Sequence, residues 1–471
     1  MLFNSVEYLI FLPIVLFCYW FIFNKSLKAQ NAFLLVCSYV FYAWWDWRFL
    51  FLLALSTFID YYFGLILSKR ETKRKLYLWL CIINNLGILF VFKYFNFFID
   101  STTVLINSAG YTVEPYILNI VLPVGISFYT FHGMSYVFDI YNRKIEPTKN
   151  FVTYSLFVAF FPLLVAGPIE RAHHLLPQIK VPRVFKSEMF FSGIKLMLFG
   201  FFKKMVVADS VAPVVNNIFE NYDTLSGATL VYGAVLFAFQ IYGDFCGYTD
   251  IARGSARLMG IELLTNFRFP YFSRDIAEFW RRWHISLSLW FRDYLYIPLG
   301  GSREGKLKAI RNTFIIFLVS GFWHGANWTF IFWGFLHALY FLPQLLASNN
   351  RKHLDDNFMH GGILTSTVNI FKVLVTFLLV CFAWIFFRAS SIGQAFDYIG
   401  NFTVKGGIAP HLLYRFDVIM IGIMLVIDYL IYAKKQLPAF VETLIYCFLL
   451  VSVAAVFAEN KFQNSFIYFQ F

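Results

Sequence analysis

The stretch that decides the fold runs in three parts: IYGDFCGYTDIARGSARLMG at 241–260, NFRFPYFSRDIAEFWRRWHISLSLWFRDYLYIPLGG at 266–301, and SGFWHGANWTF at 320–330. It places arginines, carboxylates and two histidines, His284 and His324, among tryptophans. Charged groups in apolar surroundings are costly to keep. In a chain that spans a membrane they therefore mark a functional site by default.

Composition shows that the surroundings of this stretch are apolar. The chain has 471 residues, of which 59% are hydrophobic, 21% aromatic and only 14% charged, with 61 phenylalanines. Such values are typical of a multi-spanning membrane protein. The net charge of +12 lies in short basic clusters between apolar segments, as topology signals do, so nucleic-acid binding is disfavoured. The six cysteines are scattered without CxxC spacing and are interpreted as core residues.

Apolar segments of membrane-spanning length flank the stretch on both sides. The candidate spans are 6–23, 31–45, 48–67, 76–97, 117–138, 190–209, 228–250, 369–387, 416–432 and 441–457. Three further segments are irregular. Residues 151–167 predict a re-entrant segment, residues 275–296 a single amphipathic helix at the cytoplasmic leaflet, and residues 312–346 a helical hairpin broken around HGAN.

Basic residues alternate between the predicted loops. Lys25 and Lys28 follow the first span and SKRETKRK (68–75) follows the third, whereas residues 99–119 contain no Lys or Arg. Basic loops stay in the cytoplasm, so both termini are predicted to be extracytoplasmic. The predicted fold class is an all-α polytopic membrane helix bundle of about 11 to 12 spans, in one domain over 1–471. Residues 241–330 form its expected catalytic core and 458–471 an aromatic C-terminal tail.

The two histidines are the candidate catalytic residues. An imidazole titrates near pH ~6.5, so it can take a proton from an attacking hydroxyl and return it to a leaving group. The alternative interpretation is a buried histidine that only bonds a backbone carbonyl. A metal site is disfavoured because the sequence has no HExxH and no carboxylate at ligand spacing from His324. GxSxG, GxxxxGK[ST] and GxGxxG motifs are also absent from the sequence.

Three separated motifs in order, IYGDFCGYTDIARG, EFWRRWHISLSLWFRDYLYIPLGG and FWHGANW, resemble the membrane-bound O-acyltransferase superfamily in its bacterial alginate O-acetylation-like branch. FFPLLVAGPIER (160–171) resembles another segment of that branch, and the similarity extends over essentially the whole chain. The resemblance implies a helix bundle enclosing a funnel or tunnel. It also implies that His324 is the catalytic base and His284 its companion.

The resemblance further implies an acyl thioester donor in the cytoplasm, acetyl-CoA in acetylating members, and no bound cofactor. Trp280, Arg281, Arg282 and Arg292 are the donor-binding candidates, since guanidinium groups bind phosphates. The alternative for each arginine is an ordinary positive-inside anchor.

The C-terminal sequence FIYFQF resembles a motif whose tyrosine is proposed to receive the acyl group in related systems; here that residue is Tyr468. A tyrosine hydroxyl near His324 would relay the acyl group to a partner enzyme. The alternative is an aromatic anchor at the outer interface.

The sequence therefore predicts an inner-membrane O-acyltransferase that moves an acyl group, expected to be acetyl, to an exported cell-envelope polysaccharide. We expect a separate extracytoplasmic acyltransferase as partner. Peptidoglycan O-acetylation and D-alanyl transfer to teichoic acid stay open as alternatives within the family. A transporter or lipid flippase is the alternative outside it, although the sequence shows no inverted repeat.

Overall fold

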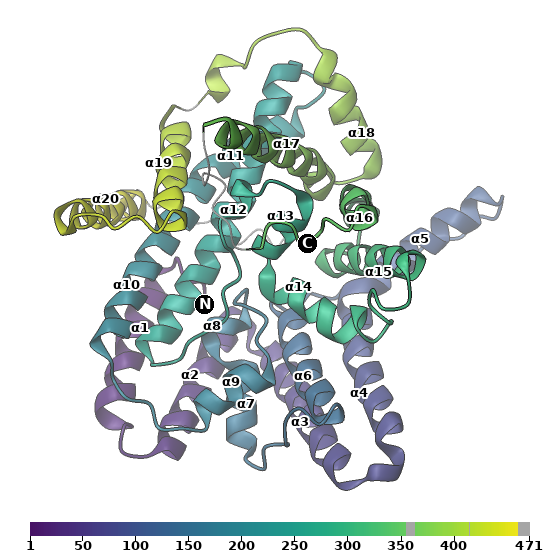
Figure 1. Ribbon diagram of the computed structural model, residues 1–471. Coiled ribbons are helices and arrows are strands. Elements are labelled where there is room, and N and C mark those ends of the chain that lie inside the picture. The colour runs from purple at the N-terminus through teal and green to yellow at the C-terminus, as the bar shows by residue number, and fades with distance from the viewer. Residues whose placement is uncertain (355–362, 414, 460–471) are drawn as a thin grey trace. The chain divides into compact units, whose positions relative to one another are not determined.

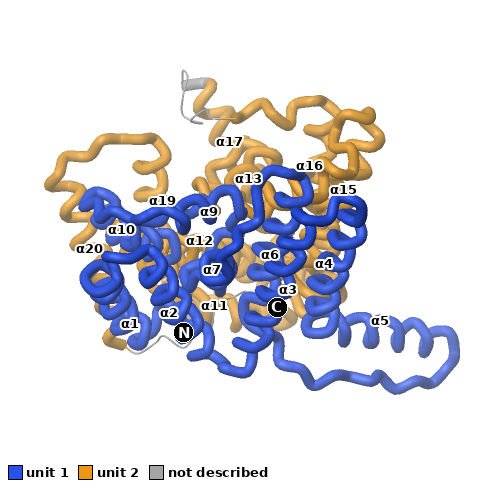
Figure 2. The backbone as a smooth tube through the Cα atoms, turned by 90° about the horizontal axis from the view of Figure 1, so that it is seen from below, with its two compact units in different colours: residues 1–194, 252–264 blue, residues 195–251, 265–471 orange. Residues whose placement is uncertain are grey.

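The computed structural model describes residues 1–354, 363–413 and 415–459, and across these ranges the chain is helical without a single β-strand. This confirms the all-α prediction (Figure 1). The chain divides into two compact units, one of residues 1–194 with 252–264 and one of residues 195–251 with 265–471 (Figure 2). The expectation of one membrane domain over 1–471 stays a prediction.

The first unit is built around α6 (Ile126–Tyr141), which is buried along nearly its whole length. Helices α3, α4, α7 and α9 contact it. The helices of this unit besides α6 are α1 (Val6–Phe17), α2 (Leu27–Asp46), α3 (Arg48–Lys69), α4 (Arg74–Leu89), α5 (Phe95–Ser108), α7 (Phe151–Ala159), α8 (Phe161–Leu164), α9 (Ala172–Ile179) and the first part of α10 (Ser187–Phe201).

The second unit holds the stretch with the two histidines. Its long central helix is α12 (Gly227–Leu258), which leaves the unit after Ile251. The other helices are α11 (Asp209–Glu220), α13 (Ile276–Arg282), α14 (Ile285–Phe291), α15 (Lys306–His324), α16 (Trp328–Leu346), α17 (Ile363–Arg388), α18 (Ile392–Gly400), α19 (Arg415–Tyr432) and α20 (Ala439–Ala458). A π-helical segment, Phe202–Ala208, joins α10 to α11.

Six helical stretches among the described residues are long and apolar enough to cross a membrane. They are Arg48–Lys69, Glu71–Ser108, Gly227–Leu258, Trp328–Leu346, Thr365–Arg388 and Ala439–Ala458. A helix satisfies its own backbone hydrogen bonds, which a bilayer interior demands. The protein is thus a multi-pass membrane protein. The expected total of about 11 to 12 spans also counts shorter segments and stays a prediction.

Two predicted helices differ from the structure. The amphipathic helix expected over 275–296 is wrong as a single element, because it breaks at Trp283 and His284 into α13 and α14. The span expected over 117–138 is helical only from Ile126. The first error arises because contacts with the distant Asn266 impose the break, which apolar spacing does not reveal. The second segment becomes helical just after Pro123 and Gly125, whose φ of 75° lies outside the helical region.

Two irregular segments remain. The segment 151–167 is not one continuous helix, since Phe160, with φ −55° and ψ 115°, separates α7 from α8. Its entry into the membrane stays a prediction. The helical hairpin is confirmed: α15 ends at His324 and α16 begins at Trp328.

Close backbone contact holds the hairpin together. A Cβ atom added to Gly334 of α16 would lie 2.2 Å from the Phe317 carbonyl oxygen of α15. A Cβ added to Gly321 of α15 would lie 2.2 Å from the Phe330 carbonyl oxygen of α16. No non-bonded carbon approaches an oxygen that closely, so only glycine permits this helix spacing. The spacing fixes the position of His324 at the end of α15.

We therefore expect Gly334→Ala to destabilise the protein by about 1–3 kcal/mol, because the added methyl group forces the two helices apart. Thermal unfolding in detergent measures this effect. Gly422→Ala in α19 is the matched control, since no atom lies within 4 Å of its added Cβ. Alanine there is expected to leave the melting temperature unchanged or raise it. Equal melting temperatures for the two variants would contradict the packing explanation.

Candidate active site

His284 lies at the break between α13 and α14 in a left-handed backbone conformation, with φ 44° and ψ 52°. This conformation is unfavourable for a residue with a side chain, by roughly 1–3 kcal/mol, and persists only where surrounding contacts impose it. Asn266 supplies those contacts. Its carbonyl oxygen accepts a hydrogen bond from the Ile285 amide at 2.9 Å, and its side-chain oxygen accepts one from the Ser286 hydroxyl at 2.9 Å.

The second histidine, His324, is the last residue of α15. The centroids of the His284 and His324 rings lie 6.1 Å apart, although 40 positions separate the two residues in the sequence. Both side chains are buried, with 0% and 3% exposure. The structure thus brings together the two residues that the sequence singled out.

Aromatic rings surround the histidine pair. The ring of Phe245 in α12 lies edge-on to the His284 ring, with 4.7 Å between the ring centroids. The Trp323 ring centroid lies 5.8 Å from that of His284. Trp333 of α16 and Phe387 of α17 lie 5.1 Å and 5.4 Å from His324. Such a shell excludes water, so a hydrogen bond formed to a reacting atom inside it is stronger than the same bond in water.

Burial also sets the protonation state of His284. It lowers the pKa of this imidazole to about 3, so the ring is neutral at neutral pH. Neither ring nitrogen has a hydrogen-bond partner among the residues that the structure describes. Buried polar atoms without a partner are rare in folded proteins. A neutral imidazole in this state is able to bond a substrate atom.

Sequence reasoning missed a third histidine. His337 of α16 is fully buried, and its Nδ1 accepts a hydrogen bond from the Trp280 indole N–H at 3.2 Å. Its ring lies 4.8 Å from that of Trp333, which in turn contacts His324. The sequence does contain a signal for His337, because this residue lies inside an apolar segment and an ionisable residue there indicates a functional position. His337 connects the histidine pair to Trp280.

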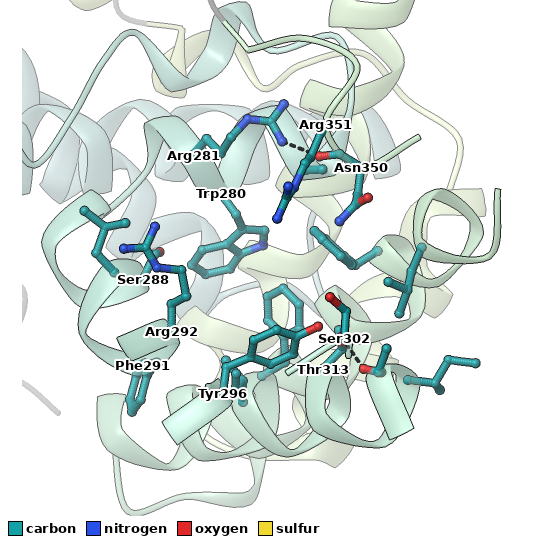
Figure 3. A pocket seen from close by; sticks show the side chains of 18 of the residues that line it. Trp280, Arg281, Ser288, Phe291, Arg292, Tyr296, Ser302, Thr313, Asn350 and Arg351 are labelled. Atoms are coloured by element: carbon teal, nitrogen blue, oxygen red, sulfur yellow. Dashed lines mark hydrogen bonds between the residues drawn. The ribbon is translucent and has the colours of Figure 1, made fainter. Parts of the chain in front are cut away.

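A cavity of about 990 Å³ opens beside Trp280 (Figure 3). It follows one face of α15, where Lys306, Ala309, Thr313, Phe317 and Ser320 line it at helical spacing. At about 1.5 Å per residue this face is about 20 Å long. His324 lies one turn beyond Ser320 on the same helix. The volume is at the upper end of the range that small-molecule sites occupy.

The charge of the cavity wall has one sign. Its basic residues are Arg268, Arg281, Arg292, Lys306 and Arg351, and none of the residues that line it is Asp or Glu. Apolar side chains, among them Ile285, Leu287 and Phe341, form the rest of the wall. A wall of this kind suits a ligand that carries both negative charge and an apolar or extended arm.

Three of the four predicted donor-binding residues line this cavity: Trp280, Arg281 and Arg292 (Figure 3). Arg281 also donates hydrogen bonds to the carbonyl oxygens of Asn350 at 2.6 Å and His353 at 2.8 Å. The fourth residue, Arg282, is not part of the wall. Its guanidinium donates to Glu278 at 2.6 Å and lies over the Tyr432 ring.

Two further sequence predictions concern other parts of the site. Tyr468 lies outside the described residues, so its role as an acyl relay stays a prediction. Within the described ranges, no group of three or more His, Cys, Asp and Glu side chains is arranged to hold a metal ion. The chemistry that the described side chains offer is proton transfer by imidazole beside a cationic cavity.

The part of the chain that forms this site is similar to known proteins. Residues 142–392 match the model of the membrane-bound O-acyltransferase family. The probable alginate O-acetylase AlgI of Azotobacter vinelandii is 40% identical over 84% of this chain and 76% of its own length. The peptidoglycan O-acetyltransferase of Helicobacter pylori is 31% identical over 100% of this chain and 98% of its own.

A more distant relative, the teichoic acid D-alanyltransferase of Bacillus subtilis, is 28% identical over 57% of this chain and 69% of its own length. The family match includes the histidine pair and the whole cavity wall. The resemblance seen in the sequence motifs is thereby confirmed. The chain belongs to the membrane-bound O-acyltransferase family and is an O-acyltransferase.

Proposed function

We propose that this enzyme transfers an acetyl group from a cytoplasmic thioester, acetyl-CoA, to hydroxyl groups of an exported cell-envelope polysaccharide. One observation carries the proposal: a buried pair of histidines lies one helical turn beyond a cavity whose charged residues are all basic. Imidazole supplies the acid–base chemistry that acyl transfer requires, and the cavity suits a polyanionic donor.

The cavity supports the choice of donor. Coenzyme A joins a phosphorylated nucleotide to an extended arm that ends in the thioester. Arg281, Arg292 and Arg351 would bind the phosphates, and the apolar face of α15 would hold the arm. The thioester then lies toward Ser320 and His324. The basic cytoplasmic loops predicted from the sequence suit a donor from that side.

In the proposed mechanism His324 acts as general base. One ring nitrogen takes the proton of the acceptor hydroxyl as its oxygen attacks the thioester carbonyl carbon. The tetrahedral intermediate collapses, the carbon–sulfur bond breaks, and the departing thiolate takes the proton back from the imidazolium. His284, 6.1 Å away, would orient the acceptor or the His324 ring through its unbonded nitrogens.

The relatives suggest the acceptor. Alginate O-acetylases at about 40% identity favour an exported polysaccharide. Peptidoglycan is the second candidate, because the peptidoglycan O-acetyltransferase matches over 100% of this chain. Transfer of D-alanyl from a carrier protein is a third, weaker alternative, since the D-alanyltransferase matches over only 57%.

We further propose that the enzyme lies in the cytoplasmic membrane with both termini outside. The alternation of basic and neutral loops supports this orientation. The sequence has no long hydrophilic interval, so a separate extracytoplasmic acyltransferase is proposed to complete transfer to the glycan. Tyr468 in the C-terminal tail would pass the acyl group to it.

His324→Ala is expected to abolish acetyl transfer, because in the proposed mechanism the His324 imidazole is the group that accepts the proton of the attacking hydroxyl. Base-labile acetyl esters in the envelope polysaccharide and peptidoglycan fractions, measured in strains with and without the substitution, provide the readout. Equal melting temperature and membrane insertion of the two proteins serve as the control for folding. A fully active variant would refute the assignment of His324 as base.

Arg351→Gln is expected to raise KM for acetyl-CoA several-fold with little change in kcat, since removing a charge from the cavity wall weakens donor binding. Titration of purified enzyme with acetyl-CoA measures the two constants. Arg48→Gln is the matched control, because Arg48 is an exposed arginine of the other unit that pairs with Asp46. Identical KM values for both variants would argue against donor binding in this cavity.

Tyr468→Phe tests the relay. Incubation of purified wild-type enzyme with labelled acetyl-CoA is expected to leave a base-labile label on the C-terminal peptide, and the variant is expected to lack it. Digestion followed by mass spectrometry locates the label. A wild-type enzyme that transfers acetyl groups without labelling this peptide would exclude the relay.

A further inference from the structure

Ser320 of α15 has no role in the mechanism proposed above. It lines the cavity at the end nearest to His324, and its side chain is 4% exposed. Within the described part of the chain, its hydroxyl has no hydrogen-bond partner. A hydroxyl group that faces a cavity without a protein partner is available to a bound molecule.

Thr313 on the same face of α15 shows what a hydroxyl in a helix does when it has no other role. Its Oγ1 donates to the Ala309 carbonyl oxygen, four residues earlier, at 2.8 Å. Serine and threonine inside apolar helices commonly bond in this way. Ser320 does not bond the Ile316 carbonyl, although the same geometry is open to it. The Ser320 hydroxyl therefore makes no hydrogen bond within α15.

The position of Ser320 relative to His324 follows from helix geometry. Four residues advance an α-helix by about 6 Å and rotate it by about 40° past a full turn. Side chains with this spacing are neighbours on the helix surface. In the proposed donor position, a thioester carbonyl close to His324 would therefore also lie close to the Ser320 hydroxyl.

We propose that Ser320 is a further catalytic residue, whose hydroxyl donates a hydrogen bond to the carbonyl oxygen of the acyl thioester and to the oxyanion that forms from it. The inference rests on the proposed function, because it takes the cavity as the donor site and His324 as the base. Two other residues of the cavity wall cannot take this role: Phe317 has no polar group, and the Trp280 N–H is bonded to His337.

The Ser320 side chain is chemically unchanged by the proposed transfer. The acceptor oxygen forms a bond to the carbonyl carbon, its proton moves to His324, and the carbonyl electron pair moves to oxygen. The Ser320 O–H stabilises the resulting negative charge and keeps its own proton. When the carbonyl re-forms, the carbon–sulfur bond breaks and the thiolate receives the proton from His324. A donor aimed at the developing charge lowers the barrier more than it strengthens substrate binding.

Ser320→Ala is expected to lower kcat by about 10²–10³-fold while KM for acetyl-CoA changes little. The assay uses membranes from cells that carry the wild-type or variant enzyme together with the extracytoplasmic partner, and follows labelled acetyl groups from acetyl-CoA into base-labile esters of the envelope glycan, per amount of enzyme. Ser452→Ala in α20 is the matched control, since this serine donates to the Phe448 carbonyl within its own helix. The control variant is expected to keep the wild-type kcat.

Ser320→Cys provides a second variant of nearly the same size if the alanine variant does not fold. Its thiol is a weak donor, so kcat is still expected to fall. A wild-type kcat in either folded variant would overturn the proposal, and so would a rise in KM with kcat unchanged. An acetyl group found on Ser320 by mass spectrometry would also overturn it, because Ser320 would then be a nucleophile. An active His324→Ala variant, in contrast, removes the proposed function itself.

Discussion

The left-handed backbone of His284 is the constraint on which the site depends. It ends α13, turns the chain and starts α14, so that the imidazole points to the interior beside His324 rather than along the surface of one long helix. Asn266 holds this turn through its backbone and side-chain oxygens. The unfavourable conformation is maintained because the alternative would leave several buried polar groups without partners.

The hairpin of α15 and α16 fixes the other half of the site. Glycines at the contact let the two backbones approach so closely that a methyl group has no room. Dense packing of this kind gives α15 one defined rotation about its axis. One face of α15 then lines the cavity, and His324 follows on the next turn. The cationic cavity and the histidine pair are therefore parts of one rigid arrangement within the second unit.

A shared buried carboxylate distinguishes Arg274 and Arg282 from the arginines of the cavity wall, of which Arg292 pairs instead with its neighbour Asp293 at 2.7 Å. Glu278 is 1% exposed and bonds both Arg274 and Arg282, so removing this carboxylate would leave two buried cations unpaired. Arg281, the neighbour of Arg282, instead contacts the loop at Asn350 and lines the cavity. Sequence reasoning assigned Arg281 and Arg282 the same donor-binding role, because the sequence does not show that these consecutive helical residues point in different directions.

The sequence by itself determined the class of protein, the helical hairpin around HGAN and the family, since apolar runs of bilayer length and short motifs are local properties. His284 and His324 were also identifiable, as ionisable groups in apolar surroundings. Only the tertiary structure decided the break at His284, the contact of His337 with Trp280 and the open position of Ser320. These depend on Asn266 and on helix rotation, which arise from contacts between residues distant in the chain and leave no local pattern.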